Sequence, residues 1–204
     1  MKSITFEQFQ SDVKNHVLKV KKDDGLYRHL LIQEPGTSCQ HYNITTWPGY
    51  LCYSGDMGCF VFQRTDDMFS FFRRDVGSIN APYLAEKLES ADRRDGYKEW
   101  DQEAFEEAVN ERLVVWLEDN RDADEDFIAE QKDKVAALIN ESNEHQAHAV
   151  AALNNFDEDE GGVDFYDFWE SYSDKYTNRF IWCCHAIVHA IALYDAQKAN
   201  EVAA

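Results

Sequence analysis

The sequence lacks any long hydrophobic run. No stretch approaches the roughly 18 consecutive apolar residues that a membrane-spanning helix needs. The first ten residues, MKSITFEQFQ, also lack the apolar segment of a secretory signal peptide. We therefore expect no membrane association and a soluble, cytoplasmic protein.

Cysteine is scarce, and its spacing excludes the common metal motifs. The chain has five cysteines, an odd number without paired metal-binding spacing: Cys39, Cys52, Cys59, Cys183 and Cys184. We expect reduced thiols that pack as small hydrophobic side chains. We predict no metal site and no cofactor.

Catalytic motifs are also missing. The chain has no phosphate-binding loop, no nucleophile motif and no compact set of acids with histidine, so we predict that it is not an enzyme. His185 and His189 are four residues apart, but Ala186 stands where the zinc-protease helix has glutamate. We interpret both histidines as core or interface residues.

Positive charge is scarce in one part of the chain. The protein has 39 acidic and 20 basic residues, a net charge of −19. Residues 95–170 hold 24 acidic and 5 basic residues, which accounts for the whole net charge, whereas residues 1–80 hold nine of each. Hydrophobic and aromatic fractions of 44% and 14% indicate a folded protein. Negative charge that is confined to one region indicates that this region binds a partner.

The first eighty residues are typical of a small α+β unit. Thr5 and Gln8 match a capping box, and apolar residues three to four apart predict a helix over 6–22. A second helix, capped by Asp66, is expected over 67–74. Between these helices, β-forming runs separated by glycine and proline predict three or four antiparallel strands, over 26–33, 42–46, 50–54 and 59–63.

Short motifs in and after these turns carry a resemblance. They are TWPGYL from Thr46, GDMG from Gly55, VFQR from Val61 and DMFSFFR from Asp67. We interpret 47–49 and 55–58 as hairpin turns, because the second runs into a strand and not into a phosphate-binding helix. The pattern, over roughly the first third of the chain, is similar to that of a family of small, acidic, uncharacterised phage and prophage proteins.

The resemblance implies a phage setting and a location in the host cytoplasm. It carries over no catalytic residues. Small acidic phage proteins include anti-CRISPR and anti-restriction inhibitors, so the resemblance favours such a role by analogy.

The remaining chain is predicted to be mostly helical. Pro82 should begin a short helix, and a longer one is expected over 98–118. After a turn, Asp122 and Glu125 match a second capping box for a helix that buries Ile139 and extends towards Leu153, with a break near Asn143. The most hydrophobic segment, 165–198, is predicted to be the central core helix.

Carboxylates crowd the polar faces of the two middle helices and the loop that follows. We take as candidate partner-binding residues Glu99, Glu103, Glu106, Glu107, Glu111, Asp122, Asp124, Asp126, Glu130, Asp133, Asp157, Glu158, Asp159 and Glu160. A calcium loop starting at Asp157 does not fit, because Gly161 would take a ligand position and Phe168 the place of the bidentate glutamate. Like charges at this spacing repel, so folding alone does not explain their number.

The predicted fold class is α+β. A small N-terminal antiparallel sheet with flanking helices, residues 1–80, should be followed by an acidic C-terminal helical bundle, residues 81–204, packed against it.

The charge density of the acidic helices resembles that of nucleic acid. Over Glu99 to Glu118, about 30 Å of helix, seven acids and one arginine leave one negative charge per roughly 5 Å. Two such helices would carry one per about 2.5 Å, against one per roughly 1.7 Å on duplex DNA. The sequence thus predicts a non-catalytic inhibitor that binds the basic groove of a host nucleic-acid-binding complex, a CRISPR effector or a restriction enzyme, without binding nucleic acid itself.

Three alternatives stay open. The acidic face could simply be solvated, in a phage structural or assembly protein or in an acidic chaperone. Clusters of Asp and Glu could instead bind magnesium in a metal-dependent enzyme. The sequence also leaves a homodimer open.

Overall fold

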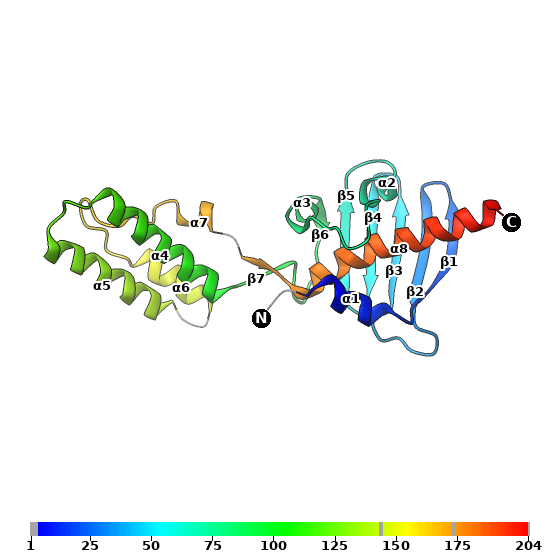
Figure 1. Ribbon diagram of the computed structural model, residues 1–204, viewed down its shortest axis with the longest axis horizontal. Coiled ribbons are helices and arrows are strands. Elements are labelled where there is room, and N and C mark those ends of the chain that lie inside the picture. Colours follow the sequence, from blue (N-terminus) through cyan, green and yellow to red (C-terminus); the bar gives the residue numbers. More distant parts are fainter. Residues whose placement is uncertain (1–3, 143–144, 173, 204) are drawn as a thin grey trace. The chain divides into compact units, whose positions relative to one another are not determined.

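The chain folds into two compact units. The computed structural model describes residues 4–142, 145–172 and 174–203 (Figure 1). Unit 1 comprises Met1–Lys98 and Tyr176–Ala204, and unit 2 comprises Glu99–Lys175. Each unit has its own hydrophobic core. Unit 2 is therefore an insertion between two segments of unit 1.

Unit 1 is built on a six-stranded antiparallel sheet, so the predicted α+β class is confirmed. Its strand order is β1-β2-β3-β4-β5-β6, each strand pairing with the next along the chain. The strands are β1 Val17–Asp24, β2 Tyr27–Gln33, β3 Tyr42–Trp47, β4 Tyr50–Gly55, β5 Gly58–Gln63 and β6 Leu88–Ser90. The four predicted strands correspond to β2–β5, whereas β1 and β6 were not predicted.

Strand β1 replaces the second half of the helix predicted over 6–22. Helix α1 spans only Phe6–Val13 and begins with the predicted capping box at Thr5 and Gln8. Beyond it, Leu18 and Val20 pack against the core and the lysine between them is exposed, which is the two-residue period of a strand. The prediction was wrong because the valines of this segment also fit a helical spacing.

The hairpin turns have the predicted form. Gly49 lies in the turn between β3 and β4 with a φ of 84°, and Gly58 begins β5 directly after the next turn with a φ of 120°. Residues that carry a side chain rarely adopt such φ angles, so glycine is required at both positions. At Gly58 an added Cβ would also approach the Asp92 carboxylate to 3.1 Å. This carboxylate accepts a hydrogen bond from the Cys59 backbone N–H, 3.1 Å away.

Helix α8, Asn178–Ala203, crosses one face of the sheet beside α1 (Figure 1). Trp182 is fully buried at the centre of this contact. Its ring packs edge-on against Phe9, Tyr42 and Tyr53, with centroids 5.1, 5.6 and 6.4 Å away. Its indole N–H donates to Asp12, 2.9 Å away. Trp182 thus joins α8, α1 and the sheet in one core.

The division of the chain differs from the predicted boundary at residue 80. Unit 1 extends to Lys98 and resumes at Tyr176, because helix α8 completes the hydrophobic core that covers the sheet. The core helix expected over 165–198 is accordingly too long, since residues 165–172 belong to unit 2. None of the described helices, α8 included, is long and apolar enough to cross a bilayer.

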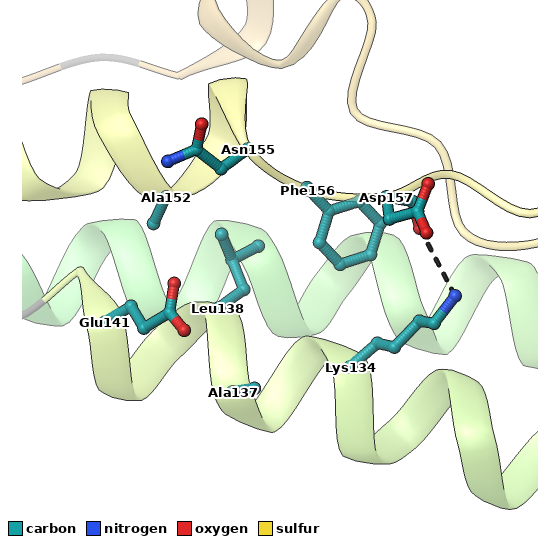
Figure 2. A pocket seen from close by; sticks show the side chains of 8 residues that line it. All are labelled: Lys134, Ala137, Leu138, Glu141, Ala152, Asn155, Phe156 and Asp157. Atoms are coloured by element: carbon teal, nitrogen blue, oxygen red, sulfur yellow. Dashed lines mark hydrogen bonds between the residues drawn. The ribbon is translucent and has the colours of Figure 1, made fainter.

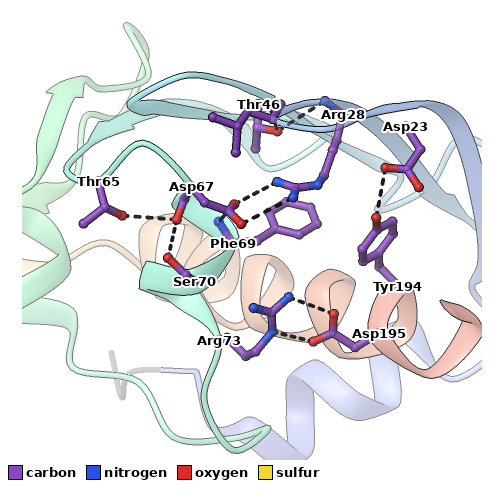
Figure 3. Close-up of polar contacts among 11 residues, drawn as sticks. Asp23, Arg28, Thr46, Thr65, Asp67, Phe69, Ser70, Arg73, Tyr194 and Asp195 are labelled. Atoms are coloured by element: carbon purple, nitrogen blue, oxygen red, sulfur yellow. Dashed lines mark hydrogen bonds and ion pairs between the residues drawn. The ribbon is translucent and has the colours of Figure 1, made fainter. Parts of the chain in front are cut away.

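Polar contacts join the short helix α2, Met68–Phe72, to the sheet and to α8 (Figure 3). The N-cap of α2 is Asp67, not the predicted Asp66. Its carboxylate accepts a hydrogen bond from Arg28, 2.8 Å away, and the Arg28 guanidinium lies 4.5 Å from the centroid of the Phe69 ring. Arg73 and Asp195 then form an ion pair of 2.7 Å between α2 and α8.

The short helix after residue 80 was placed almost correctly. Helix α3 spans Ala81–Ala85 and is capped by Asn80, with Pro82 in its first turn. Leu88 lies beyond this helix and begins β6.

All five cysteines are free thiols. Cys183 and Cys184 are buried on α8, as expected of thiols that pack as hydrophobic groups. Cys39 and Cys59 are exposed, so that expectation fails for them.

The two α8 histidines are core residues. His185 is buried and its ring stacks on Phe9, with centroids 5.6 Å apart. His189 Nδ1 lies 2.9 Å from the Tyr42 hydroxyl. Burial, with a smaller effect of His16, lowers the pKa of His189 to about 4. The folded state therefore favours neutral His189.

Acidification should destabilise unit 1 through His189. Its pKa is about 4 when folded and about 6.5 when unfolded. The unfolded chain therefore binds the proton first, and stability is lost as the pH falls from about 6.5 towards 4. We expect a loss of roughly 2 kcal/mol at pH 4.5, measured by urea unfolding. His189→Gln, which keeps an acceptor for Tyr42, should flatten this dependence, and an unchanged dependence would contradict it.

Candidate protein-binding surface

Unit 2 is a small helical unit. Its helices are α4 Gln102–Asp119, α5 Glu125–Glu141, α6 Gln146–Asn154 and α7 Phe168–Ser171. Helix α4 packs on α5, and α5 packs on α6 (Figure 1). Phe105, Val109 and Trp116 of α4 meet Val135 and Leu138 of α5 in the core. The apolar faces of these two helices therefore pack together.

The helix starts differ from those predicted. Asp101 caps α4 through the Ala104 N–H, so Glu99 lies outside the helix, in the two-residue strand β7 (Lys98–Glu99). Strand β7 pairs with β8, Lys175–Tyr176. Asp124 caps α5 through the Asp126 N–H, 3.0 Å away, and the predicted box from Asp122 is not formed.

The predicted extension of the second helix to Leu153 is also corrected. Helix α5 ends at Glu141, and Leu153 belongs to the separate helix α6. The predicted break at Asn143 lies outside the described residues.

Most candidate carboxylates are exposed. The exposed candidates are Glu99, Glu103, Glu107, Glu111, Asp122, Asp124, Asp126, Glu130, Asp133, Asp157, Glu158 and Glu160. Two rows emerge among them, because residues three or four apart share a helix face. We call these rows the acidic surface: Glu103, Glu107 and Glu111 on α4, and Asp126, Glu130 and Asp133 on α5.

The basic residues of unit 2 mostly pair with carboxylates outside the acidic surface. Arg112 pairs with Asp167 and Lys134 with Asp159, both at 2.5 Å. Lys175 lies 3.3 Å from Asp101 and 3.9 Å from Glu99. One weak pair, Lys134 to Glu130 at 3.8 Å, reaches the acidic surface.

The α4 row is therefore not neutralised locally. Among the described residues, no ion pair involves Glu103, Glu107 or Glu111. These carboxylates are left to interact with solvent or with a partner.

Asp159 holds unit 2 together and does not lie free for a partner. Gln131, whose side chain is fully buried on α5, donates to Asp159 at 2.6 Å and accepts from the Val163 N–H at 3.0 Å. The hydrogen bonds from Lys134 and Gln131 lower the pKa of Asp159. These contacts anchor the acidic loop to α5. Gln131 was missed in the sequence, although a glutamine in an apolar stripe is a signal for such a role.

Three other candidates also have internal roles. Glu106 is half-buried and accepts a hydrogen bond from Gln102, 2.8 Å away. Glu158 accepts one from the Phe165 N–H, 3.3 Å away, and Asp124 caps α5. We therefore leave Glu106, Glu158 and Asp124 out of the acidic surface.

Exposed apolar side chains interrupt the carboxylates of α4. Val114 and Val115 are 53% and 51% exposed between Glu111 and Glu118. The polar face of this helix is therefore not a continuous row of carboxylates. On α7, Trp169 is 38% exposed as well.

A small cavity of about 150 Å³ lies between α5, α6 and the loop after α6 (Figure 2). Leu138, Ala152 and Phe156 form its apolar walls, and Glu141 and Asp157 add carboxylates. Lys134 donates a hydrogen bond to the Asp157 backbone carbonyl, 3.4 Å away, beside it. The cavity is smaller than the roughly 300 Å³ at which small-molecule sites begin. It has room for a single side chain.

No metal centre is evident in the part of the chain that the structure describes. There, no group of three or more His, Cys, Asp or Glu side chains is placed to hold a metal ion.

The chain was compared with known proteins of three kinds. Comparisons with protein-family models, with curated proteins and with solved structures found no match.

Proposed function

We propose that the protein is a phage-encoded, non-catalytic inhibitor that acts in the host cytoplasm. Its acidic surface binds the nucleic-acid groove of a host defence complex, a CRISPR effector or a restriction enzyme. The protein does not bind nucleic acid itself. The phage setting rests on the resemblance of the motifs between Thr46 and Arg73.

The main support for the proposal is that the boundary between the acidic and the neutral part of the chain coincides with the boundary between the two units. Unit 2 contains 24 acidic and 5 basic residues, a formal charge of −19. Unit 1 contains 15 of each and is formally neutral. Acidity that served only solubility would spread over both units. A whole structural unit with a negative net charge favours a binding partner with a positively charged surface.

The observed helices also give a charge spacing comparable to that of nucleic acid. Helix α4 has six acidic residues and one basic, and α5 has five acidic and two basic. Together they carry eight net negative charges over about 27 Å, one per roughly 3.4 Å. This spacing is wider than the sequence predicted, because α5 contains two lysines. It equals the roughly 3.4 Å per charge of a single strand within duplex DNA.

A groove that binds phosphates releases counterions when an anionic partner enters it. The same groove should attract the acidic surface, with a fast and salt-sensitive association. Binding of the protein and of DNA would then be mutually exclusive. This competition is the inhibitory step.

A displacement assay tests the proposal. A labelled duplex is bound to each of a panel of purified CRISPR effectors and restriction enzymes, and the protein is titrated in at 50 and at 300 mM salt. We expect displacement from at least one complex at 50 mM and a tenfold or greater loss of potency at 300 mM. Polyglutamate of the same net charge is the control. Failure to displace any duplex, or displacement no better than that by polyglutamate, contradicts the proposal.

A further inference from the structure

Apolar side chains lie beside the α4 row of the acidic surface. Val114 and Val115 follow Glu111 by three and four residues, so they continue the line of the row along the helix. Both valines are more than half exposed. A β-branched residue at an exposed helix position lowers helix propensity and presents apolar surface to water. Neither helix stability nor solubility therefore explains the two valines.

A groove of about 350 Å³ lies on this part of α4. Among the described residues it is lined by Ala108, Glu111, Arg112 and Val115. These residues recur at three- and four-residue intervals, so they form one strip along the helix. We call this strip the α4 groove. It is more than twice as large as the cavity in Figure 2 and has room for more than one side chain.

The segment that leads into α7 borders the α4 groove, because Asp167 pairs with Arg112. Two exposed aromatic residues lie close to Asp167 in this segment: Tyr166 is 94% and Trp169 is 38% exposed. Trp169 stacks on the buried Phe105 of α4, with ring centroids 6.2 Å apart, and is thereby held against this helix. Tyrosine and tryptophan are enriched among the residues that dominate the binding energy of protein interfaces.

The charges around the α4 groove indicate what can occupy it. The Arg112 guanidinium is paired with Asp167, whereas Glu111 forms no ion pair in the part of the chain that the structure describes. A nucleic acid, an anionic lipid surface or a second copy of this acidic unit would be repelled by the α4 row. A protein segment with both basic and apolar side chains complements the row and the groove together.

We propose that the α4 groove binds an apolar side chain of a basic protein segment, whose lysines or arginines pair with the α4 row. This inference rests on the proposed function in taking the partner to be a basic protein, and it adds how that partner is selected. The acidic row attracts any basic surface. An apolar side chain that must fit beside the paired charges distinguishes one basic surface from another.

The two kinds of contact should differ in their response to salt. Pairing between exposed carboxylates and lysines is screened as the ionic strength rises. Burial of an apolar side chain in the α4 groove involves no charge, so its contribution should persist. A partner that used the charges alone would lose its whole affinity with salt.

Binding of two short lysine-rich peptides to the full chain tests the proposal. The peptides are identical except that one has leucine at its centre and the other has serine, and fluorescence anisotropy of a label on each measures its affinity. We expect the leucine peptide to bind roughly tenfold more tightly, because part of the leucine side chain is buried. This ratio should be the same at about 50 and about 300 mM salt, although both affinities fall.

A substitution in the α4 groove locates this preference. Val115→Ser removes an apolar wall of the groove without changing the net charge. It should weaken binding of the leucine peptide roughly fivefold and leave binding of the serine peptide unchanged. The matched control Val150→Ser makes the same change at an exposed position of α6 and should alter neither affinity. Circular dichroism establishes that both variants are folded.

Equal affinity of the wild type for the two peptides overturns the proposal, and this comparison needs no variant. So does a preference for leucine that a folded Val115→Ser variant retains. The peptide assay contains neither duplex nor defence complex, so its outcome is independent of the displacement assay. A leucine preference without displacement of any duplex would contradict the proposed function alone, and displacement without a leucine preference would contradict this inference alone.

Discussion

Reversal of Glu103, Glu107 and Glu111 to lysine is expected to reduce displacement of duplex from the target complex at least a hundredfold. The variant changes six charge units on the α4 row of the acidic surface, which is exposed. At roughly 0.5 kcal/mol per unit, the loss is about 3 kcal/mol, or more than a hundredfold. The residual binding should depend less on salt, because fewer counterions are exchanged. Displacement is measured by fluorescence anisotropy of the labelled duplex.

The fold should tolerate this reversal. The three side chains are exposed, and within the described residues they form no ion pairs. Lysine is about as good a helix former as glutamate.

A matched control distinguishes the effect of where the charge is reversed from the effect of the change in net charge. Asp24, Asp66 and Glu89 are exposed residues of unit 1, and their reversal to lysine gives the same net charge of −13. This control should displace duplex as well as the wild type does. An equal loss of displacement in both variants would show that only net charge matters. No loss of displacement in the α4 variant would show that α4 is not part of the contact.

Trp182→Ala is expected to destabilise unit 1 by about 3–5 kcal/mol. The substitution removes the ring that contacts Phe9, Tyr42 and Tyr53, and it leaves the Asp12 carboxylate without the indole donor. Unit 2 should be unaffected, because its core shares no residue with that of unit 1. Hydrogen exchange followed by mass spectrometry measures the stability of each unit through its own peptides.

The control for this experiment is Trp169→Ala, which deletes the same side chain from unit 2. Trp169 is 38% exposed, so its loss should cost about 1 kcal/mol and should leave unit 1 protected. If Trp182→Ala also removed protection from residues 99–175, the two units would unfold as one. That result would contradict the separation of their cores.

The sequence predicted strands β2–β5 well because two independent signals agree there. Turn residues such as Gly49 and Gly58 mark the ends, and runs of β-forming residues lie between them. In β1 the signals conflict, since Val17 and Val20 fit a helix as well as a strand. The hydrophobic character of α8 was also clear from the sequence. Its place in unit 1 was not, because hydrophobicity does not specify which core a helix joins.

The candidate surface was predictable to the extent that exposure follows helix periodicity. Glu103, Glu107 and Glu111 are exposed because Phe105 and Val109 define the opposite, buried face of α4. The role of Asp159 depends on Gln131 and Lys134, which lie 28 and 25 residues away in sequence. Periodicity within one segment contains no information about such contacts.

The insertion of unit 2 between the two segments of unit 1 has a consequence for synthesis on the ribosome. Unit 2 is continuous in sequence and can fold as soon as it emerges. The sheet is made earlier but must wait for α8, which follows unit 2 in the sequence, before Tyr42, Tyr53 and Phe60 are covered. During that interval the nascent chain exposes an aromatic surface while it already carries the full negative charge of unit 2. Mutual repulsion between neighbouring nascent chains would then limit their aggregation until α8 has emerged.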